Sequence, residues 1–227
     1  MNKNAIEYWY PKIKDIVVTP KTVIIPAEKV WDVTGNYIHV PEEYVAGIIK
    51  EAESFSYPLF LRTSHTSVKH GWKDTCFVER KKVLRYHIQR LAYESECLDV
   101  FGGPPLTSFA IREYIEMDSK FTHFGSGLPI NPERRYFINN HKVICHHSYW
   151  TSESIADTRY GDYLNDMNKE TPLEQCELHT TASKIAQVFD GYWSIDFCLA
   201  KSGTWYCIDM AEGNRSWHPK CKLKVIE

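Results

Sequence analysis

The 227 residues suffice for one large domain or two closely packed lobes, and such a chain can bury a substantial core without disulfides or structural metals. Its 27 basic and 29 acidic side chains nearly cancel, which argues against a broad electrostatic surface for nucleic acid or anionic lipid. Seven cysteines, an odd number without any C-x-x-C pair, argue against a secreted disulfide framework. We expect reduced thiols, and a small molecule or a protein as partner.

The N-terminus and the hydropathy of the chain predict no targeting or membrane segment. The residues after Met1 are polar, unlike the apolar run of a signal peptide, and no apolar stretch is long enough to cross a bilayer. The expected location is therefore cytoplasmic. Residues 1–19 are expected to form a lead segment before the first lobe.

Strands and helices alternate in the first half of the chain. The spacing of Tyr44, Val45, Ile48 and Ile49 predicts a helix within residues 41–55. A longer helix follows, and its apolar face is formed by Val83, Leu84, His87, Ile88 and Leu91. Short strands are predicted at residues 17–18, 22–25, 57–62 and 76–78, with a polar loop at residues 63–75.

A run of two glycines and two prolines, residues 102–105, is the strongest chain-breaking signal. We place the boundary between two lobes there, so that they span residues 20–107 and 108–227. Strands then dominate, at residues 108–115, 135–138, 143–150, 192–199 and 204–209, the last two as a hairpin. One helix has an apolar face at Leu178, Ala182, Ile185, Ala186 and Phe189. This order predicts an α+β protein whose sheets are covered by helices on one side.

The hairpin carries the most informative polar residues. Asp196 and Asp209 lie on its two strands and are placed almost symmetrically about the turn, so pairing brings their carboxylates side by side. Glu212 and Asn214 follow as two more oxygen ligands. Mg²⁺ prefers such an incomplete oxygen cage, which it completes with water and phosphate oxygens. The alternative, idle carboxylates in solvent, is disfavoured because Asp196 is flanked by apolar residues in its strand, where an unpaired charge is costly.

Cationic residues elsewhere could hold a polyphosphate. Arg62 ends a strand, and Lys69 and Lys73 lie in the polar loop that follows, among small and hydroxyl residues whose backbone N–H groups add donors. The loop lacks the GxxxxGK[ST] spacing of a Walker A loop, and an ordinary surface loop is the alternative. Arg135, at the start of a later strand, could also reach a phosphate, or could form a surface salt bridge.

Arg112, Glu113, Tyr114 and Ile115 follow the proposed boundary within an apolar strand. A connecting segment at this place could offer backbone groups to the edge of an adenine ring. A strand with an alternating charged face would give the same pattern.

The run Cys145, His146 and His147, with His141 nearby, suggests zinc. Consecutive residues on a strand point to opposite faces, so Cys145 and His147 share a face that His146 does not. No second ligand pair with zinc-like spacing is evident, and we therefore reject this interpretation. A catalytic cysteine–histidine pair has no local sequence support either.

Taken in chain order, these segments resemble the ATP-grasp superfamily, in which two α+β lobes clamp ATP between antiparallel sheets. Arg62 and the loop after it resemble the phosphate-covering region, and residues 112–115 resemble the adenine-binding segment between the lobes. Residues 133–137 resemble an E-x-R-x-F strand, and residues 194–214 resemble the metal-binding hairpin. The resemblance covers residues 20–216.

The chain departs from the usual ligase pattern of this superfamily at two places. The second metal strand usually carries Glu-x-Asn, but this chain has Ala211 where that Asn stands, so Glu212 or Asn214 must substitute if two metals bind. About twenty residues precede the domain, whereas carboxylate-amine ligases generally carry a further N-terminal domain, so the acceptor site is open.

The resemblance implies binding of ATP with Mg²⁺. It further implies an ATP-dependent carboxylate-amine or carboxylate-thiol ligase that acts through an acylphosphate, with Arg135 and Lys69 as catalytic cations and with substrates that the sequence does not identify. The loop at residues 67–74 is also similar to that of a short single-domain branch, which contains a cell-division-cycle protein that assists assembly of a translation initiation factor. The alternative is therefore an ATP-binding assembly factor for a protein partner, without ligase turnover.

Overall fold

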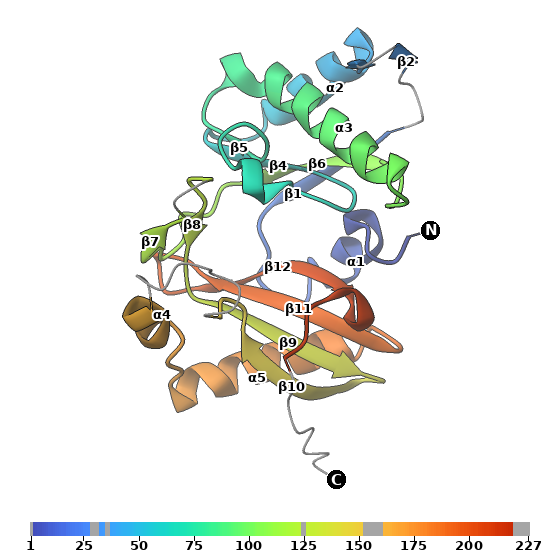
Figure 1. Cartoon of the computed structure of the whole chain (residues 1–227). Helices are drawn as coiled ribbons and strands as arrows, with labels where there is room; N and C mark the ends of the chain where they lie inside the picture. The colour runs from blue at the N-terminus through green and yellow to red at the C-terminus, as the bar shows by residue number, and fades with distance from the viewer. Residues whose placement is uncertain (1, 28–31, 35–36, 124–125, 152–160, 220–227) are drawn as a thin grey trace.

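The computed structural model describes residues 2–27, 32–34, 37–123, 126–151 and 161–219. Within these ranges, two four-stranded antiparallel sheets face each other, and helices cover their outer surfaces (Figure 1). The predicted α+β class is thereby confirmed.

The first sheet has the strand order β1-β6-β4-β5. Its strands are β1 (Thr22–Pro26), β4 (Leu59–Thr63), β5 (Phe77–Val78) and β6 (Ser108–Glu113). Two helices, α2 (Glu42–Ala52) and α3 (Leu84–Val100), bury apolar faces against it, because their apolar residues recur at helical spacing. We call this sheet and these helices the first lobe.

The second sheet has the strand order β10-β9-β11-β12. Its strands are β9 (Glu133–Asn139), β10 (Lys142–Ser148), β11 (Tyr192–Leu199) and β12 (Trp205–Glu212). Helix α5 (Pro172–Ala186) and helix α1 (Ile6–Ile13) pack into one core with it. We call this sheet, with α1 and α5, the second lobe.

Helix α1 lies in the segment that we expected to be a simple lead. Ile6, Trp9 and Ile13 are fully buried at helical spacing, and Pro11 within the helix weakens its sequence signal. The strand predicted at residues 17–18 is absent, because the chain there continues the turn that ends α1: the N–H of Val17 donates to the carbonyl of Ile13 (3.1 Å).

Strand β6 lies in the first sheet, between β1 and β4, although we had placed its residues in the second lobe. The glycine pair that suggested the boundary instead ends α3. Gly102 adopts φ +84°, and the N–H groups of Gly102 and Gly103 donate to the carbonyls of Asp99 and Leu98 (both 2.8 Å), which is a Schellman motif. A helix cap and a lobe boundary give the same sequence signal.

The chain crosses between the lobes at two neighbouring places, just before β1 and just after β6. The N–H of Glu113 donates to the carbonyl of Lys21 (2.9 Å), and the N–H of Lys21 donates to the Glu113 carboxylate (2.6 Å). The two crossings are therefore tied side by side.

The remaining described elements are short. They are β2 (Asp32–Thr34), β3 (Tyr37–His39), η1 (Lys69–Gly71), η2 (Lys81–Val83), β7 (Phe121–Thr122), β8 (Pro129–Ile130), α4 (Gly161–Met167) and η4 (Gly213–Arg215). None of the helices in the described ranges has the length and hydropathy that a bilayer crossing requires.

Arg134 fastens α5 to the second sheet. Its side chain is 1% exposed, and its guanidinium forms ion pairs with Glu170 (2.7 Å), just before α5, and with Glu174 (3.1 Å), in the first turn of α5. Anionic side chains are favoured at a helix N-terminus, and the buried arginine needs them as counterions.

We predict that Arg134→Ala lowers the free energy of unfolding by about 3 kcal/mol, because removing one partner leaves buried carboxylates without compensation. Urea denaturation measures this change. Lys81→Ala, which removes an exposed ion pair with Glu53, is the control and should leave stability nearly unchanged. Equal effects of the two substitutions would contradict the role of Arg134.

Candidate functional site between the two sheets

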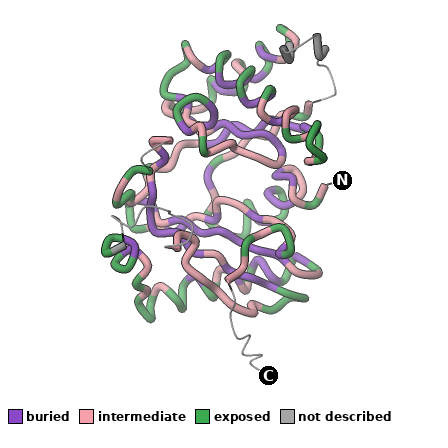
Figure 2. The backbone as a smooth tube through the Cα atoms, viewed as in Figure 1, coloured by how far each residue is buried: buried purple, intermediate pink, exposed green. Residues whose placement is uncertain are grey.

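A cavity of about 350 Å³ lies between the facing sheets and is lined by residues from both lobes. Figure 2 shows buried stretches of both sheets on its two sides, while exposed residues gather on the outer helices. Sheet strands alternate their side chains between two faces, so residues on the inner faces point into the cavity.

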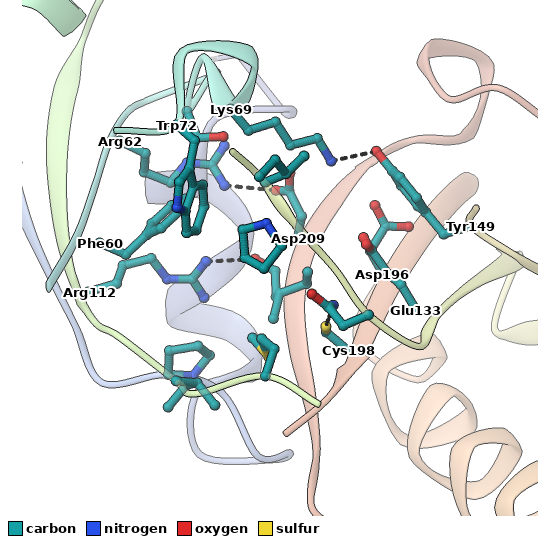
Figure 3. A pocket seen from close by; sticks show the side chains of 18 of the residues that line it. Phe60, Arg62, Lys69, Trp72, Arg112, Glu133, Tyr149, Asp196, Cys198 and Asp209 are labelled. Atoms are coloured by element: carbon teal, nitrogen blue, oxygen red, sulfur yellow. Dashed lines mark hydrogen bonds and ion pairs between the residues drawn. The ribbon is translucent and has the colours of Figure 1, made fainter. Parts of the chain in front are cut away.

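Two arginine–aspartate pairs stand in this cavity. The hairpin pairs Asp196 with Asp209, as its sequence symmetry predicts. Arg62, from the first sheet, donates to the Asp209 carboxylate (3.0 Å), and Arg135 donates through Nε and Nη2 to Asp196 (2.7 and 2.8 Å). The first pair joins the two lobes, and the second lies within the second sheet (Figure 3).

A β-bulge turns Asp209 toward the cavity. The register shifts between Asp196 and Phe197, which leaves Ile208 of β12 as an extra residue between Cys207 and Asp209. Cys207 lies in the core on the α5 side, so strict alternation would place Asp209 there too. The carbonyl of Ile208 accepts a hydrogen bond from Nη1 of Arg112 (2.7 Å).

Burial and neighbouring charges act differently on the three carboxylates. Burial raises the pKa of Asp196, and Arg135 offsets this only in part. Burial would also raise the pKa of Asp209, but Arg62 outweighs it, and the net pKa is lowered. Burial raises the pKa of Glu133 to about 7, despite the attraction of Lys69. The cavity therefore holds closely balanced charges.

Lys69 extends from the loop after β4 to the second lobe. Its Nζ donates to the hydroxyl of Tyr149 (2.8 Å) and lies over the rings of Tyr149 and Trp150. Burial would lower its pKa, but Glu133 and Tyr149 raise it overall, so the amine is charged at neutral pH. The guanidinium of Arg135 lies 4.6 Å from the centre of the Tyr149 ring.

The other end of the cavity is aromatic. Phe60, Trp72 and Tyr114 contact one another through their rings, at centroid distances of 6.0 and 6.4 Å from Trp72. In Figure 3, Phe60 and Trp72 lie on the opposite side of the cavity from Glu133 and Asp196. The site thus joins a flat, apolar end to a charged end.

Arg112 lies beside this aromatic end. Burial lowers its pKa to about 10, which leaves it protonated at neutral pH. Its Nη2 is buried and has no hydrogen-bond acceptor among the described residues. An acceptor atom of a bound molecule would satisfy this donor.

Most of the residues predicted for the site line the cavity. They are Arg62, Lys69, Arg112, Glu113, Tyr114, Ile115, Arg135, Asp196 and Asp209. Three do not: Lys73 and Asn214 are exposed to solvent, and Glu212 accepts a hydrogen bond from the side chain of Asn4 (3.3 Å) and pairs with Lys3.

The structure adds residues that the sequence did not single out. Glu133 lies diagonally from Asp196 on the neighbouring strand, and it is the Glu of the E-x-R-x-F pattern, which was a usable signal. Tyr149 and His65 line the cavity without any comparable signal, because each depends on which segments the fold brings together.

A comparison with known families decides the assignment. Residues 30–226 match the model of an ATP-grasp domain family, which is described as family 3 of its clade. The chain belongs to this family. ATP-grasp domains typically bind ATP with Mg²⁺. The resemblance inferred from the sequence is confirmed.

Solved structures of this fold are similar to the ATP-grasp chain. Cdc123 from Schizosaccharomyces pombe, C-terminally truncated, is 15% identical, with a TM-score of 0.58 over 93% of this chain and 86% of that chain. The N5-carboxyaminoimidazole synthase from Aspergillus clavatus, in complex with ADP and 5-aminoimidazole ribonucleotide, is 12% identical, with a TM-score of 0.52 over 92% and 44%. Identities this low show a shared fold.

Among curated proteins, the phosphoglycerate kinase of Saccharolobus solfataricus is 25% identical over 130 residues. The match covers 56% of this chain and 32% of that protein. The ATP-grasp chain thus spans about a third of this relative and less than half of the synthase.

His65, in the wall of the cavity, gives a pH-dependent prediction. Its ring lies between the hydroxyls of Ser64 (3.1 Å) and Ser95 (3.3 Å), and burial, with Arg62 nearby, lowers its pKa to about 4. The unfolded chain, with a pKa near 6.5, therefore binds a proton that the folded chain does not. This contribution to stability is complete above pH 6.5 and is lost as the pH falls toward 4.

We predict that His65→Gln reduces the acid-induced loss of stability between pH 6.5 and 4 by up to about one bound proton in the slope of unfolding free energy against pH. Urea denaturation at a series of pH values measures the slope. The exposed His123, replaced by Gln, is the control and should leave the slope unchanged. An unaltered slope in His65→Gln would show that His65 does not titrate in this way.

Proposed function

We propose that this chain binds ATP with Mg²⁺ in the cavity between its sheets and uses it as an ATP-dependent ligase. The observation that supports this most strongly is the pair of arginine–aspartate contacts in one cavity, Arg62 with Asp209 and Arg135 with Asp196. Each contact joins a group suited to phosphate to a group suited to a metal ion.

The aromatic end of the cavity suits an adenine ring. Phe60, Trp72 and Tyr114 offer apolar ring surfaces, and the backbone from Arg112 to Ile115 lies at the crossing between the lobes, where it can contact a ring edge. The buried, unmatched Nη2 of Arg112 adds a donor for a nucleotide oxygen or nitrogen. These features fit a nucleotide better than a compact anion.

The charged end suits the phosphates and the metal. Asp196 and Asp209, with Glu133 beside them, would hold Mg²⁺, which supplies positive charge to the β- and γ-phosphate oxygens. Arg62 and Arg135 would then pair with phosphate oxygens in place of the carboxylates. Every buried charge keeps a partner in this exchange, which removes much of the cost of desolvating the bound nucleotide.

The ligase reaction needs no nucleophilic side chain. A carboxylate oxygen of the substrate attacks the γ-phosphorus, the bond to the bridging oxygen breaks, and ADP leaves. An amine or thiol then attacks the acylphosphate carbon, loses its proton, and releases inorganic phosphate. Lys69 and Arg135 would stabilise the transferring phosphoryl group, and the loop around Lys69 would exclude water that hydrolyses acylphosphates.

One observation favours a second candidate, an ATP-binding assembly factor. Helix α3 ends in exposed apolar side chains: Leu98 is 44% exposed, Val100 81% and Phe101 89%. A cluster of this kind often marks a protein contact. In this alternative, ATP bound between the lobes fixes their relative position for a protein partner, and the ATP is not turned over.

We predict that the parent protein binds ATP in a Mg²⁺-dependent manner and that Asp196→Asn or Asp209→Asn weakens this binding at least about tenfold, because each removes a metal ligand. Isothermal titration calorimetry with and without Mg²⁺ measures both effects. Absence of ATP binding to the parent protein would overturn the proposal.

The matched control is Glu212→Gln, a change of carboxylate to amide on the same strand as Asp209 but outside the cavity. Unchanged affinity in this variant restricts the metal ligands to the cavity. A loss equal to that of Asp209→Asn would instead support the metal set predicted from sequence, which includes Glu212 and Asn214.

The ligase and assembly-factor hypotheses differ in turnover. We predict that ADP and phosphate accumulate only when a candidate carboxylate and a candidate amine or thiol are both present, because the acylphosphate forms on one and is captured by the other. A coupled ADP assay over a substrate panel measures this. Tight ATP binding without turnover in any combination would favour the assembly factor.

A further inference from the structure

Three metal-binding side chains meet at the edge of the second sheet, outside the residues that line the nucleotide cavity. Cys145 and His147 lie on the edge strand β10, and His218 lies in the segment after η4. Their ligand atoms all lie within 4.8 Å of one another. Nε2 of His218 is 3.2 Å from Sγ of Cys145 and 3.2 Å from Nε2 of His147.

A second β-bulge puts Cys145 and His147 on the same side as His218. The register of β10 shifts between Val143 and Cys145, so Ile144 is an extra residue. Val143 packs into the core on the α5 side, and strict alternation would send Cys145 there as well. The bulge reverses this.

His146 takes the opposite side. Its ring stacks on Tyr136, a residue of the core on the α5 side (4.8 Å between centroids), and its Nε2 contacts Glu170 (2.9 Å). It therefore points away from the cluster. The sequence pattern alone predicted that Cys145 and His147 share a face, but it offered no further ligand.

The segment after η4 supplies that ligand in a fixed orientation. The His218 ring packs on Phe137 (4.0 Å between centroids), and its Nδ1 contacts the hydroxyl of Tyr192 (3.1 Å). In metal sites, the second ring nitrogen of a ligating histidine commonly donates to such an oxygen, which fixes the tautomer. Nε2 of His218 then carries no proton and faces Cys145 and His147.

The two short contacts of His218 converge on this single nitrogen. One ring N–H cannot donate fully to the sulfur and to the second imidazole together. A central cation would instead accept a lone pair from all three atoms. Tetrahedral zinc bonds of about 2.0 to 2.3 Å hold ligand atoms about 3.3 to 3.6 Å apart, close to the two separations of 3.2 Å.

We propose that Cys145, His147 and His218 form a zinc site. The thiol releases its proton to solvent when the ion binds, and one thiolate with two neutral imidazoles is a ligand set that suits Zn²⁺ and disfavours Mg²⁺. Water or another group occupies the fourth position. Cys221, three residues after His218 in the sequence, lies outside the described residues, and we assign it no role.

The ion would fasten the segment after η4 to the inner face of the second sheet. Two contacts already hold that segment: Nη1 of Arg135 donates to the carbonyl of Trp217 (3.3 Å), and the hydroxyls of Ser194 and Ser216 lie 2.6 Å apart. The first of these involves an arginine of the nucleotide cavity. Zinc at this place would therefore stabilise the second lobe directly beside the cavity.

The test titrates the full chain, stripped of metal with a chelator, with Co²⁺ as a spectroscopic substitute for Zn²⁺. We expect one equivalent to bind, with the strong visible bands of tetrahedral Co²⁺ and a thiolate charge-transfer band, and Zn²⁺ to displace it. Cys145→Ser should abolish the charge-transfer band, and His218→Ala should weaken binding at least about tenfold. Zn²⁺ should raise the Tm of the parent protein and not that of either variant.

Cys176→Ser and His146→Gln are the matched controls, because Cys176 is an exposed cysteine elsewhere and His146 points to the other side of the sheet. Both should bind Co²⁺ as the parent does. Weak, octahedral Co²⁺ spectra in the parent protein, or a charge-transfer band that survives in Cys145→Ser, would overturn the zinc site. Neither result depends on whether the protein binds ATP.

Discussion

The pairing of buried opposite charges between the two sheets is the constraint on which this structure depends. Arg62 and Arg112 from the first lobe, and Arg135 from the second, are placed where little water reaches them. A charge in such surroundings is costly unless it is paired, and the hairpin supplies two carboxylates at that place. The two lobes thus meet across charges that a cationic metal and an anionic nucleotide can share.

The two β-bulges of the second sheet have the same effect at different places. Each inserts one residue, Ile208 or Ile144, so that the next polar side chain leaves the apolar core and faces inward. Asp209 reaches the nucleotide cavity in this way, and Cys145 reaches the histidine cluster. One sheet can therefore carry a continuous apolar face under α5 and a chemically dense face opposite, although its strands do not alternate strictly.

Local patterns in the sequence revealed most of the sheet strands, the helices α2, α3 and α5, and the facing aspartates, because these depend on periodicity or on symmetry about one turn. What escaped prediction depends on long-range contacts. Helix α1 is stabilised by packing against distant strands, and His218 meets Cys145 only because the segment after η4 returns across the sheet. Glu212 follows Asp209 closely in sequence, yet it ends beside Asn4, because the end of β12 lies beyond the edge of the cavity.

The way α1 joins the second lobe has a consequence for the order in which the protein folds. The first lobe is complete once Glu113 has been synthesised, and its contacts are mostly between neighbouring segments. Helix α1, which is made earlier, buries Trp9 and Ile13 only against strands that emerge last. During synthesis the first lobe can therefore fold as an insertion while α1 remains without its core, and closing the second lobe requires contacts across most of the chain, the kind that slow folding.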